Sequence, residues 1–249
     1  MKLPLTSAVA SGVVFLDSVE STNSYIAGIS EKFADYGVVV SVNQTAGRGR
    51  RGRQWISIPG QTLAASIIVP FETSSVASTW LPILAGVAVV QSLEKISDQE
   101  VDLKWPNDLL VQSKKVGGIL CEMVSSKRSI VGVGTNLSVP EKDLPENGGS
   151  IWHPDYGFER AVDIYLSSLV GNFRAILKLA SELSTGELIA RELAPLIATV
   201  GKTVRVHETD SLSWSGQAIG LSRQGHLVVR LDGGEDREVV AADIQHLRE

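Results

Sequence analysis

Short apolar segments at close intervals between residues 101 and 139 constrain the fold of this chain most strongly. The chain runs here through VDLKW with DLLVQ, then KVGGILCEMV, then SIVGVGTNLSV, with the polar stretches SKK and SSKR between them. Each segment has the length and composition of a strand, and the stretches between them have the composition of turns. The pattern therefore predicts an antiparallel meander.

Further strands and a buried helix are expected before this meander. Residues 36–43 are rich in valine, and residues 62–70 are rich in small and branched apolar residues, so both segments predict strands. Residues 79–96 are mostly apolar, with helical spacing among their larger side chains. Such a segment is typical of a helix that is buried on several faces.

The pattern changes near Thr199. Between Glu159 and Leu183 apolar residues recur at helical spacing, which predicts a long amphipathic helix, and a shorter helix is expected over 187–198. After Thr199, short apolar runs alternate with Asp, Ser and Gly turns, as in a small β-barrel. We therefore expect an α+β protein. A mixed, mostly antiparallel sheet flanked by helices would occupy residues 1–198, and a small barrel would occupy residues 199–249.

Composition excludes several classes of protein. The chain has 249 residues, 43% hydrophobic and 20% charged, which is typical of a globular protein. Its only cysteine, Cys121, permits no internal disulfide, which fits a reducing cytoplasm. No run of apolar residues is long enough for a membrane span. The formal net charge of −5 argues against a general nucleic-acid surface but leaves a local phosphate site open.

A dense group of positive charges stands out in this acidic chain. The stretch AGRGRRGRQW, residues 46–55, contains four arginines and three glycines and ends at Trp55. Arginine forks suit phosphate or carboxylate groups, and glycine allows the backbone to approach a ligand closely. Spacing alone leaves two other interpretations open, a solvated surface loop and a contact with single-stranded nucleic acid.

Two neighbouring strands of the predicted meander carry paired glycines. These lie in KKVGGIL, residues 114–120, and in GVGTN, residues 132–136. Glycine inside a strand often marks a place where a ligand lies against the backbone, so the pair predicts a shallow trough for a flat, mostly apolar ligand. Lys114 and Lys115 enter the first strand, and at least one of them is expected to be a solvated turn residue.

Two polar stretches have both a structural and a functional interpretation. KWPNDLL, residues 104–110, is typical of a β-turn, but it also presents Lys, Trp, Asn and Asp together. In DSVESTNSY, residues 17–25, Ser21 and its neighbours are expected to cap a helix that begins near Ser24. Hydroxyl and N–H groups at such a helix start also bind polar groups of a ligand.

In this order, the motifs STN, NQTAGRGRRGRQW, KWPNDLL, KVGGIL and GVGTN resemble those of the biotin protein ligases over nearly the whole chain. The resemblance implies a C-terminal barrel of the SH3-like type. The family commonly has Leu-Ala-Gly where this chain has Val116-Gly117-Gly118, and Ile where it has Thr135, which affects details of the pocket. Some members carry a DNA-binding domain before STN. Only residues 1–20 precede that motif here, so we expect the monofunctional type, which does not bind DNA.

The resemblance implies a reaction in two steps. Biotin and ATP form biotinyl-5′-adenylate and pyrophosphate, and a specific lysine of a biotin carboxyl carrier protein then takes the biotinyl group and releases AMP. Mg²⁺ is expected with ATP, and no tightly bound prosthetic group is expected. The expected location is the cytoplasm, without contact to a membrane. An exposed strand of the meander leaves a weak homodimer open.

The resemblance also assigns residues to roles. Lys115 bridges the biotin carboxylate and the α-phosphate, and Trp55 covers the adenine. The residues with catalytic roles are Lys115, Arg48, Arg50 and Asp108. The biotin-binding residues are Ser21, Thr22, Asn23, Gln44, Arg48, Gly49, Arg50, Lys115, Gly118, Gly132 and Gly134. The nucleotide-binding residues are Arg50, Arg51, Arg53, Trp55, Asn107, Lys115 and Asn136. No metal ligand is assigned.

The sequence is also compatible with two other functions. A lipoate-type ligase shares the fold and the adenylate chemistry, but GRGRRGR and KWPND favour biotin. A nucleic-acid-binding module would use the arginine stretch but would leave the paired glycines unexplained. Because like charges repel and glycines resist ordering, we expect the empty arginine stretch to be mobile and to close over biotinyl-adenylate as a lid.

Overall fold

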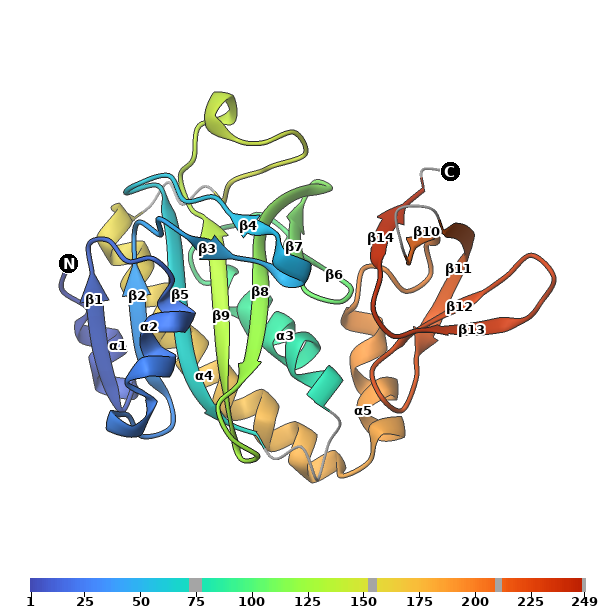
Figure 1. The fold of residues 1–249 in the computed structure, drawn as a ribbon, viewed down its shortest axis with the longest axis horizontal. Coiled ribbons are helices and arrows are strands. Elements are labelled where there is room, and N and C mark those ends of the chain that lie inside the picture. The colour runs from blue at the N-terminus through green and yellow to red at the C-terminus, as the bar shows by residue number, and fades with distance from the viewer. Residues whose placement is uncertain (72–77, 152–155, 209–211, 248–249) are drawn as a thin grey trace.

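The computed structural model describes residues 1–71, 78–151, 156–208 and 212–247, and its centre is a seven-stranded sheet (Figure 1). The strands are β1 (Gly12–Leu16), β2 (Gly37–Ser41), β5 (Thr62–Pro70), β6 (Asp102–Lys104), β7 (Asp108–Val111), β8 (Lys114–Met123) and β9 (Arg128–Asn136). Their order is β1-β2-β5-β9-β8-β7-β6. Only β1 and β2 pair in parallel, so the mixed, mostly antiparallel sheet predicted from the sequence is confirmed.

Helices cover both faces of this sheet. The helices α1 (Pro4–Val9), α3 (Leu81–Leu93) and α4 (Phe158–Leu183) lie on one face, and α2 (Thr22–Gly28) lies on the other (Figure 1). Side chains alternate along β2, so Val38 and Val40 join the large core under the three helices, whereas Val39 packs with Ile26 of α2. Because both faces are covered, every residue of β2 is buried.

The helices agree with the sequence pattern where that pattern was strong. Helix α3 is buried on nearly all sides, and α4 has 26 residues with one apolar face, as expected. Helix α5 (Gly186–Leu193) ends before Pro195, in a 3₁₀ turn over Ala194–Leu196. The sequence did not predict α1 or β1, although Pro4 at the first turn of α1 is a common helix-start signal. Within the described residues, no helix combines the length and apolar character that a bilayer span requires.

The chain after residue 199 forms a second, five-stranded antiparallel sheet. Its strands are β10 (Thr203–His207), β11 (Ser213–Leu221), β12 (Leu227–Arg230), β13 (Asp236–Val239) and β14 (Asp243–His246), in the order β13-β12-β11-β10-β14. Among the described residues, no ladder joins β13 to β14, so the predicted barrel is not closed by hydrogen bonds. Short alternating strands specify antiparallel neighbours, whereas closure also depends on strand tilt and stagger, which a local pattern does not encode. The division of the chain at 198/199 stays a prediction.

Buried hydrogen bonds tie the second sheet to the turn between β6 and β7. The Trp105 backbone N–H donates to Thr199 Oγ1 at 3.0 Å, and the Trp105 indole donates to the Gly225 carbonyl at 3.1 Å. Thr199 Oγ1 also lies 3.0 Å from His246 Nε2, within hydrogen-bond distance. Burial, followed by the charges of Lys202 and Lys104, lowers the pKa of His246 to about 4.

This contact predicts a loss of stability in acid. Below pH 6.5 the unfolded chain protonates His246, but the folded protein does so only near pH 4, so stability falls as pH falls through this window. Carboxyl groups also titrate between pH 6.5 and pH 4, so wild type is compared with the His246→Gln variant, which keeps them. We expect the variant to be less stable than wild type at pH 7.5, because it disturbs the Thr199 contact. The difference in stability between the two proteins should be smaller at pH 5. Thermal unfolding measured at both pH values tests this, and a constant gap would contradict it.

Candidate active site

A cavity of about 210 Å³ lies on the face of the central sheet that carries α2. Four parts of the chain meet there: the start of α2, a hairpin formed by the arginine stretch, the turn over residues 104–108, and residues 242–244 of the second sheet. Strands β8 and β9 form its floor through residues such as Gly118 and Gly134. The cavity therefore joins segments that are far apart in the sequence.

Nearly all residues assigned from the sequence line this cavity. They are Ser21, Thr22, Asn23, Gln44, Arg48, Gly49, Arg50, Arg51, Arg53, Trp55, Asn107, Asp108, Lys115, Gly118, Gly132 and Gly134. Asn136 is the exception. It is buried at the end of β9, where its amide donates to the Gly149 carbonyl at 2.9 Å. The structure thus places Asn136 in the support of the 144–150 loop and does not bring it to the cavity.

The arginine stretch crosses the sheet as a short hairpin. Strands β3 (Gly47–Arg48) and β4 (Gln54–Trp55) pair with each other, and a 3₁₀ turn over Arg50–Gly52 connects them. Figure 1 shows the hairpin in front of β9 and β8. A side chain at Gly47 would meet the Trp55 carbonyl oxygen at 2.4 Å, so this close pairing requires glycine there.

Each arginine of the hairpin has an acceptor. Arg48 forms an ion pair with Glu122 at 2.7 Å, and Arg50 donates to Asn107 Oδ1 at 2.9 Å. Arg53 forms an ion pair with Asp243 of the second sheet. Arg51 lies 3.9 Å from the same carboxylate and donates to the Glu208 carbonyl at 3.1 Å. The hairpin thus contacts both sheets through its charged side chains.

Positive charge dominates the cavity. Six Lys and Arg side chains line it, against two carboxylates, Asp108 and Asp243. Burial lowers the pKa of Arg50 and the pKa of Lys104, because partial loss of water disfavours the charged form. Lys115 Nζ lies 2.6 Å from Asp108 Oδ1. Partly dehydrated cations bind an incoming anion strongly, so the cavity is suited to phosphate or carboxylate groups.

The two neighbouring lysines of β8 differ as expected from the sequence. Lys115 lines the cavity, whereas Lys114 forms an exposed ion pair with Glu141 at 2.7 Å. Alternation along the strand explains the difference, because successive side chains point to opposite faces of a sheet. Lys114 is therefore the solvated turn lysine.

The paired glycines of β8 and β9 make room for protein side chains. A side chain at Gly134 would meet the Trp55 ring at 2.5 Å, and one at Gly132 would meet Asn23 Oδ1 at 2.2 Å. The two strands are neighbours, as the sequence predicted, and Gly118 lies across from Gly134 in the ladder. The trough predicted from the glycines is therefore partly covered by Trp55 and Asn23, and contact of these glycines with a ligand stays a prediction.

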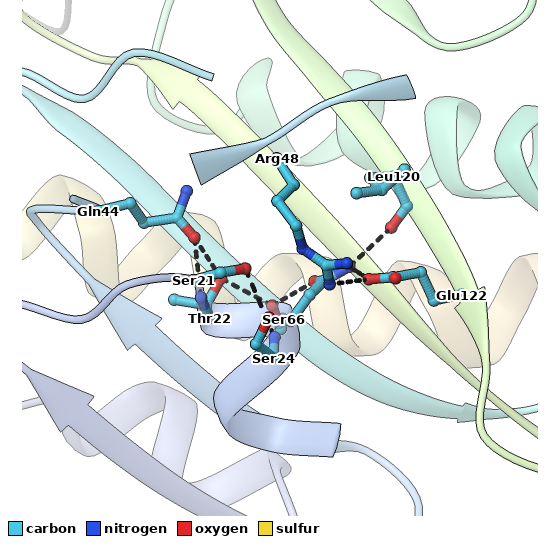
Figure 2. Close-up of polar contacts among 9 residues, drawn as sticks. Ser21, Thr22, Ser24, Gln44, Arg48, Ser66, Leu120 and Glu122 are labelled. Atoms are coloured by element: carbon cyan, nitrogen blue, oxygen red, sulfur yellow. Dashed lines mark hydrogen bonds and ion pairs between the residues drawn. The ribbon is translucent and has the colours of Figure 1, made fainter. Parts of the chain in front are cut away.

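Hydroxyl and amide groups cluster at the start of α2 (Figure 2). Ser21 is the predicted cap, and its hydroxyl accepts from the Ser24 N–H at 3.4 Å. The Thr22 N–H donates to Gln44 Oε1 at 2.8 Å. The Asn23 amide donates to Glu122 at 2.7 Å, while its oxygen accepts from Ser66 at 2.6 Å. Ser21, Thr22, Asn23 and Ser66 are almost fully buried, so these contacts fix their positions.

Sequence reasoning missed several residues of the site. Lys104 and Asp243 line the cavity, and Ser66 and Glu122 form hydrogen bonds to residues that line it. Lys104 lies in the KWPNDLL stretch, so the sequence could have indicated it. Glu122 and Ser66 are polar residues within otherwise apolar strand segments, and alternation along those strands would have placed them on the ligand face. No local sequence feature indicates Asp243, because it reaches the cavity only through the packing of the second sheet.

Comparisons with known proteins agree with this geometry. The Biotin/lipoate A/B protein ligase family matches residues 15–136, and the biotin protein ligase C-terminal domain matches residues 199–247. The biotin–[acetyl-CoA-carboxylase] ligase of Mycobacterium tuberculosis is 31% identical over 94% of this chain and 89% of its own length. The bifunctional ligase/repressor BirA of Escherichia coli is 27% identical over 89% of this chain and 70% of its own length.

Solved structures lead to the same family. A variant of the biotin protein ligase from Aquifex aeolicus in complex with biotin has a TM-score of 0.74 and 25% identity, with 95% of this chain and 99% of that chain covered. The complex of that ligase with biotin and ATP has a TM-score of 0.72 at 24% identity, which supports the fold. The fold, the order of the motifs and the full-length relatives agree, and this chain belongs to the biotin protein ligase family.

Proposed function

We infer that this chain activates biotin with ATP and transfers the biotinyl group to a lysine of a biotin carboxyl carrier protein. The carrying observation is a single cavity in which partly dehydrated cations adjoin a buried cluster of hydroxyl and amide groups. The cations suit the carboxylate and phosphate groups of the two substrates. The polar cluster at the start of α2 suits the ureido ring of biotin, which carries both hydrogen-bond donors and an acceptor.

In the first step a biotin carboxylate oxygen attacks the α-phosphorus of ATP. A new O–P bond forms, the bond from the α-phosphorus to the bridging oxygen breaks, and pyrophosphate leaves with the electron pair. Two anions must approach each other, so fixed positive charge between them lowers the barrier. We assign this charge to Lys115 and Arg50, which line the same cavity. Asn107 orients Arg50 through its hydrogen bond to the guanidinium group.

The nucleotide is assigned to the side of the cavity near the second sheet. Arg51 and Arg53 would hold phosphates there, and in the structure their partner is the Asp243 carboxylate. Phosphate and Asp243 therefore compete for the same guanidinium groups. Trp55 is proposed to cover the adenine. Its indole N–H is buried without a hydrogen-bond partner among the described residues, which leaves it free to donate to a ligand.

Among the residues that the structure describes, no group of three His, Cys, Asp or Glu side chains could hold a metal ion. We propose that Mg²⁺ enters with the phosphates of ATP, as is common for this ion, and no step above depends on it.

In the second step a lysine amine of the carrier attacks the carbonyl carbon of the adenylate. The new C–N bond forms, the amine loses a proton, and AMP leaves. Asp108 lies in the cavity within 2.6 Å of Lys115, so we propose that it orients the amine or receives its proton once the substrates have engaged Lys115. We further propose a cytoplasmic enzyme that acts without DNA and forms a weak homodimer, which sizing measurements would detect.

The direct test of the proposed function compares acids as substrates. Pyrophosphate release from MgATP is expected with biotin, and with neither lipoate nor ATP alone. Mass spectrometry should then show a biotinyl group on one lysine of a carrier domain. Lipoate-dependent release without biotin-dependent release would favour the lipoate-type alternative. Binding of single-stranded nucleic acid that falls steeply with salt, with no ATP turnover, would favour the nucleic-acid module.

Lys115 and Lys114 provide a matched pair for the first step. Lys115→Ala should lower the rate of adenylate formation by about 10²–10³-fold, because it removes a charge used in the transition state. Lys114→Ala removes only an exposed ion pair with Glu141, so it should stay close to wild type. Pyrophosphate release measures both rates. Equal effects of the two substitutions would show that the role of Lys115 is wrong.

The lid hypothesis can be tested with trypsin, which cleaves flexible chains after arginine. The first cut is expected between Arg48 and Arg53, and biotin with MgATP should slow it more than ATP alone. Asp243→Asn should accelerate the cut in the free protein, because Arg51 and Arg53 lose their shared carboxylate. Asp236→Asn is the control, since Asp236 pairs with Arg230 on the second sheet. A cleavage rate that changes neither with biotin and MgATP nor with Asp243→Asn would exclude a hairpin that closes over the ligand.

A further inference from the structure

One carboxylate oxygen of Glu122 binds two side chains that line the cavity (Figure 2). Glu122 Oε2 accepts from Arg48 Nη2 at 2.7 Å and from Asn23 Nδ2 at 2.7 Å. Asn23 continues through Ser66 to Thr22, and both Asn23 and Thr22 are almost fully buried. Glu122 itself does not line the cavity, so it acts on a ligand only through these neighbours.

Proton counting sets the direction of the hydrogen bonds in this chain. The Asn23 amide nitrogen donates to Glu122 Oε2 and to the Leu120 carbonyl, so Asn23 Oδ1 can only accept. The single proton of the buried Ser66 hydroxyl must therefore go to Asn23 Oδ1, 2.6 Å away. In the hydroxyl pair of Ser66 and Thr22, 2.8 Å apart, Thr22 then supplies the proton.

Thr22 consequently has no hydroxyl proton left for a ligand. Gln44 Oε1, which accepts from the Thr22 backbone N–H at 2.8 Å, is a second protein acceptor for this proton, 3.1 Å from Thr22 Oγ1, so the proton stays within the protein in either case. At the cavity the Thr22 hydroxyl therefore offers lone pairs only. A ligand atom beside it must be a hydrogen-bond donor.

We propose that Glu122 is a positioning residue that selects the acid substrate. Its carboxylate holds Arg48 at the cavity wall and orients the Asn23–Ser66–Thr22 chain, so that Thr22 accepts a hydrogen bond from an N–H of the biotin ureido ring. The inference rests on the proposed function, since it takes biotin as the ligand. A site arranged to accept from an N–H strongly rejects an acid that lacks it, as the dithiolane ring of lipoate does, because buried lone pairs are then left unpaired.

The first test removes the charge of Glu122. A glutamine oxygen at this position can still accept from both donors, but it is neutral, so the charge-assisted hydrogen bond from Arg48 is weakened and Arg48 is held less firmly. Glu122→Gln should therefore raise the Kd for biotin, measured by calorimetry without ATP, by about 10–100-fold. The KM for ATP should change by less than about threefold, a split that general loss of structure would not give. Glu141→Gln, at the exposed ion pair with Lys114, should bind biotin as the wild type does.

The second test breaks the chain without touching Arg48. Ser66→Ala removes the acceptor that lies 2.8 Å from the Thr22 hydroxyl, so only the more distant Gln44 Oε1 competes for the Thr22 proton and Thr22 can donate to a ligand as well as accept. The probes are biotin and the two cyclic carbamates in which a ring oxygen replaces one ureido N–H. Wild type should bind one carbamate far more weakly than biotin, and Ser66→Ala should reduce that ratio by about tenfold or more.

The outcomes separate the inference from the function it rests on. Unchanged biotin affinity in folded Glu122→Gln would overturn the role of Glu122, and so would an unchanged carbamate ratio in Ser66→Ala, with pyrophosphate release by wild type intact in both cases. A wild type that neither binds biotin nor releases pyrophosphate with it would overturn the function and this inference together. Weaker biotin binding by Glu122→Gln together with a reduced carbamate ratio in Ser66→Ala would support the inference. Thermal unfolding of each variant establishes that it is folded.

Discussion

Repulsion among the cations around the cavity is the constraint that the rest of the site satisfies. Arg48, Arg50, Arg51 and Arg53 come from one short hairpin, and Lys104 and Lys115 face them from the sheet. Such a group is stable only if acceptors hold each charge apart from the next. The acceptors come from three places, namely strand β8, the 104–108 turn and the second sheet. The positive site in an acidic chain thus depends on carboxylates that the fold delivers from elsewhere.

This arrangement explains why the second sheet belongs to the chemistry. Asp243 is the partner of Arg51 and Arg53, and Thr199 and Gly225 hold the turn that carries Asn107 and Asp108. A carboxylate that pairs with an arginine keeps that arginine in place and leaves it able to exchange one anion for another. The second sheet therefore supports this side of the cavity, and Asp243 would compete with the phosphates that we propose bind there.

The polar cluster beside α2 solves a different problem. Burying amides and hydroxyls is unfavourable unless each finds a partner, and here Ser66, Asn23 and Thr22 satisfy one another. Because a hydroxyl has only one proton, satisfaction also imposes a direction. Direction turns a group of ordinary polar residues into a surface that distinguishes donors from acceptors. The glycine at position 132 is part of the same arrangement, since any side chain there would displace Asn23.

The sequence by itself determined the elements and most of the site. Alternation and helical spacing predicted β2, β5, β8, β9, α3 and α4, because burial of one face or of both faces leaves a local signature. The order of the motifs identified the family and sixteen of the lining residues, from Ser21 to Gly134. The sequence pattern did not predict helix α1 and strand β1, because both are short. Helix α1 is also held by contacts to Asp163 of α4.

Only the tertiary structure decided the open edge of the second sheet, the removal of Asn136 from the cavity, and the partnerships of Glu122 and Asp243. The physical reason is distance along the chain. Asp243 meets residues 190 positions before it, and Glu122 meets Arg48 across 74 positions. A local pattern records which side a residue faces, but it does not record what packing brings opposite.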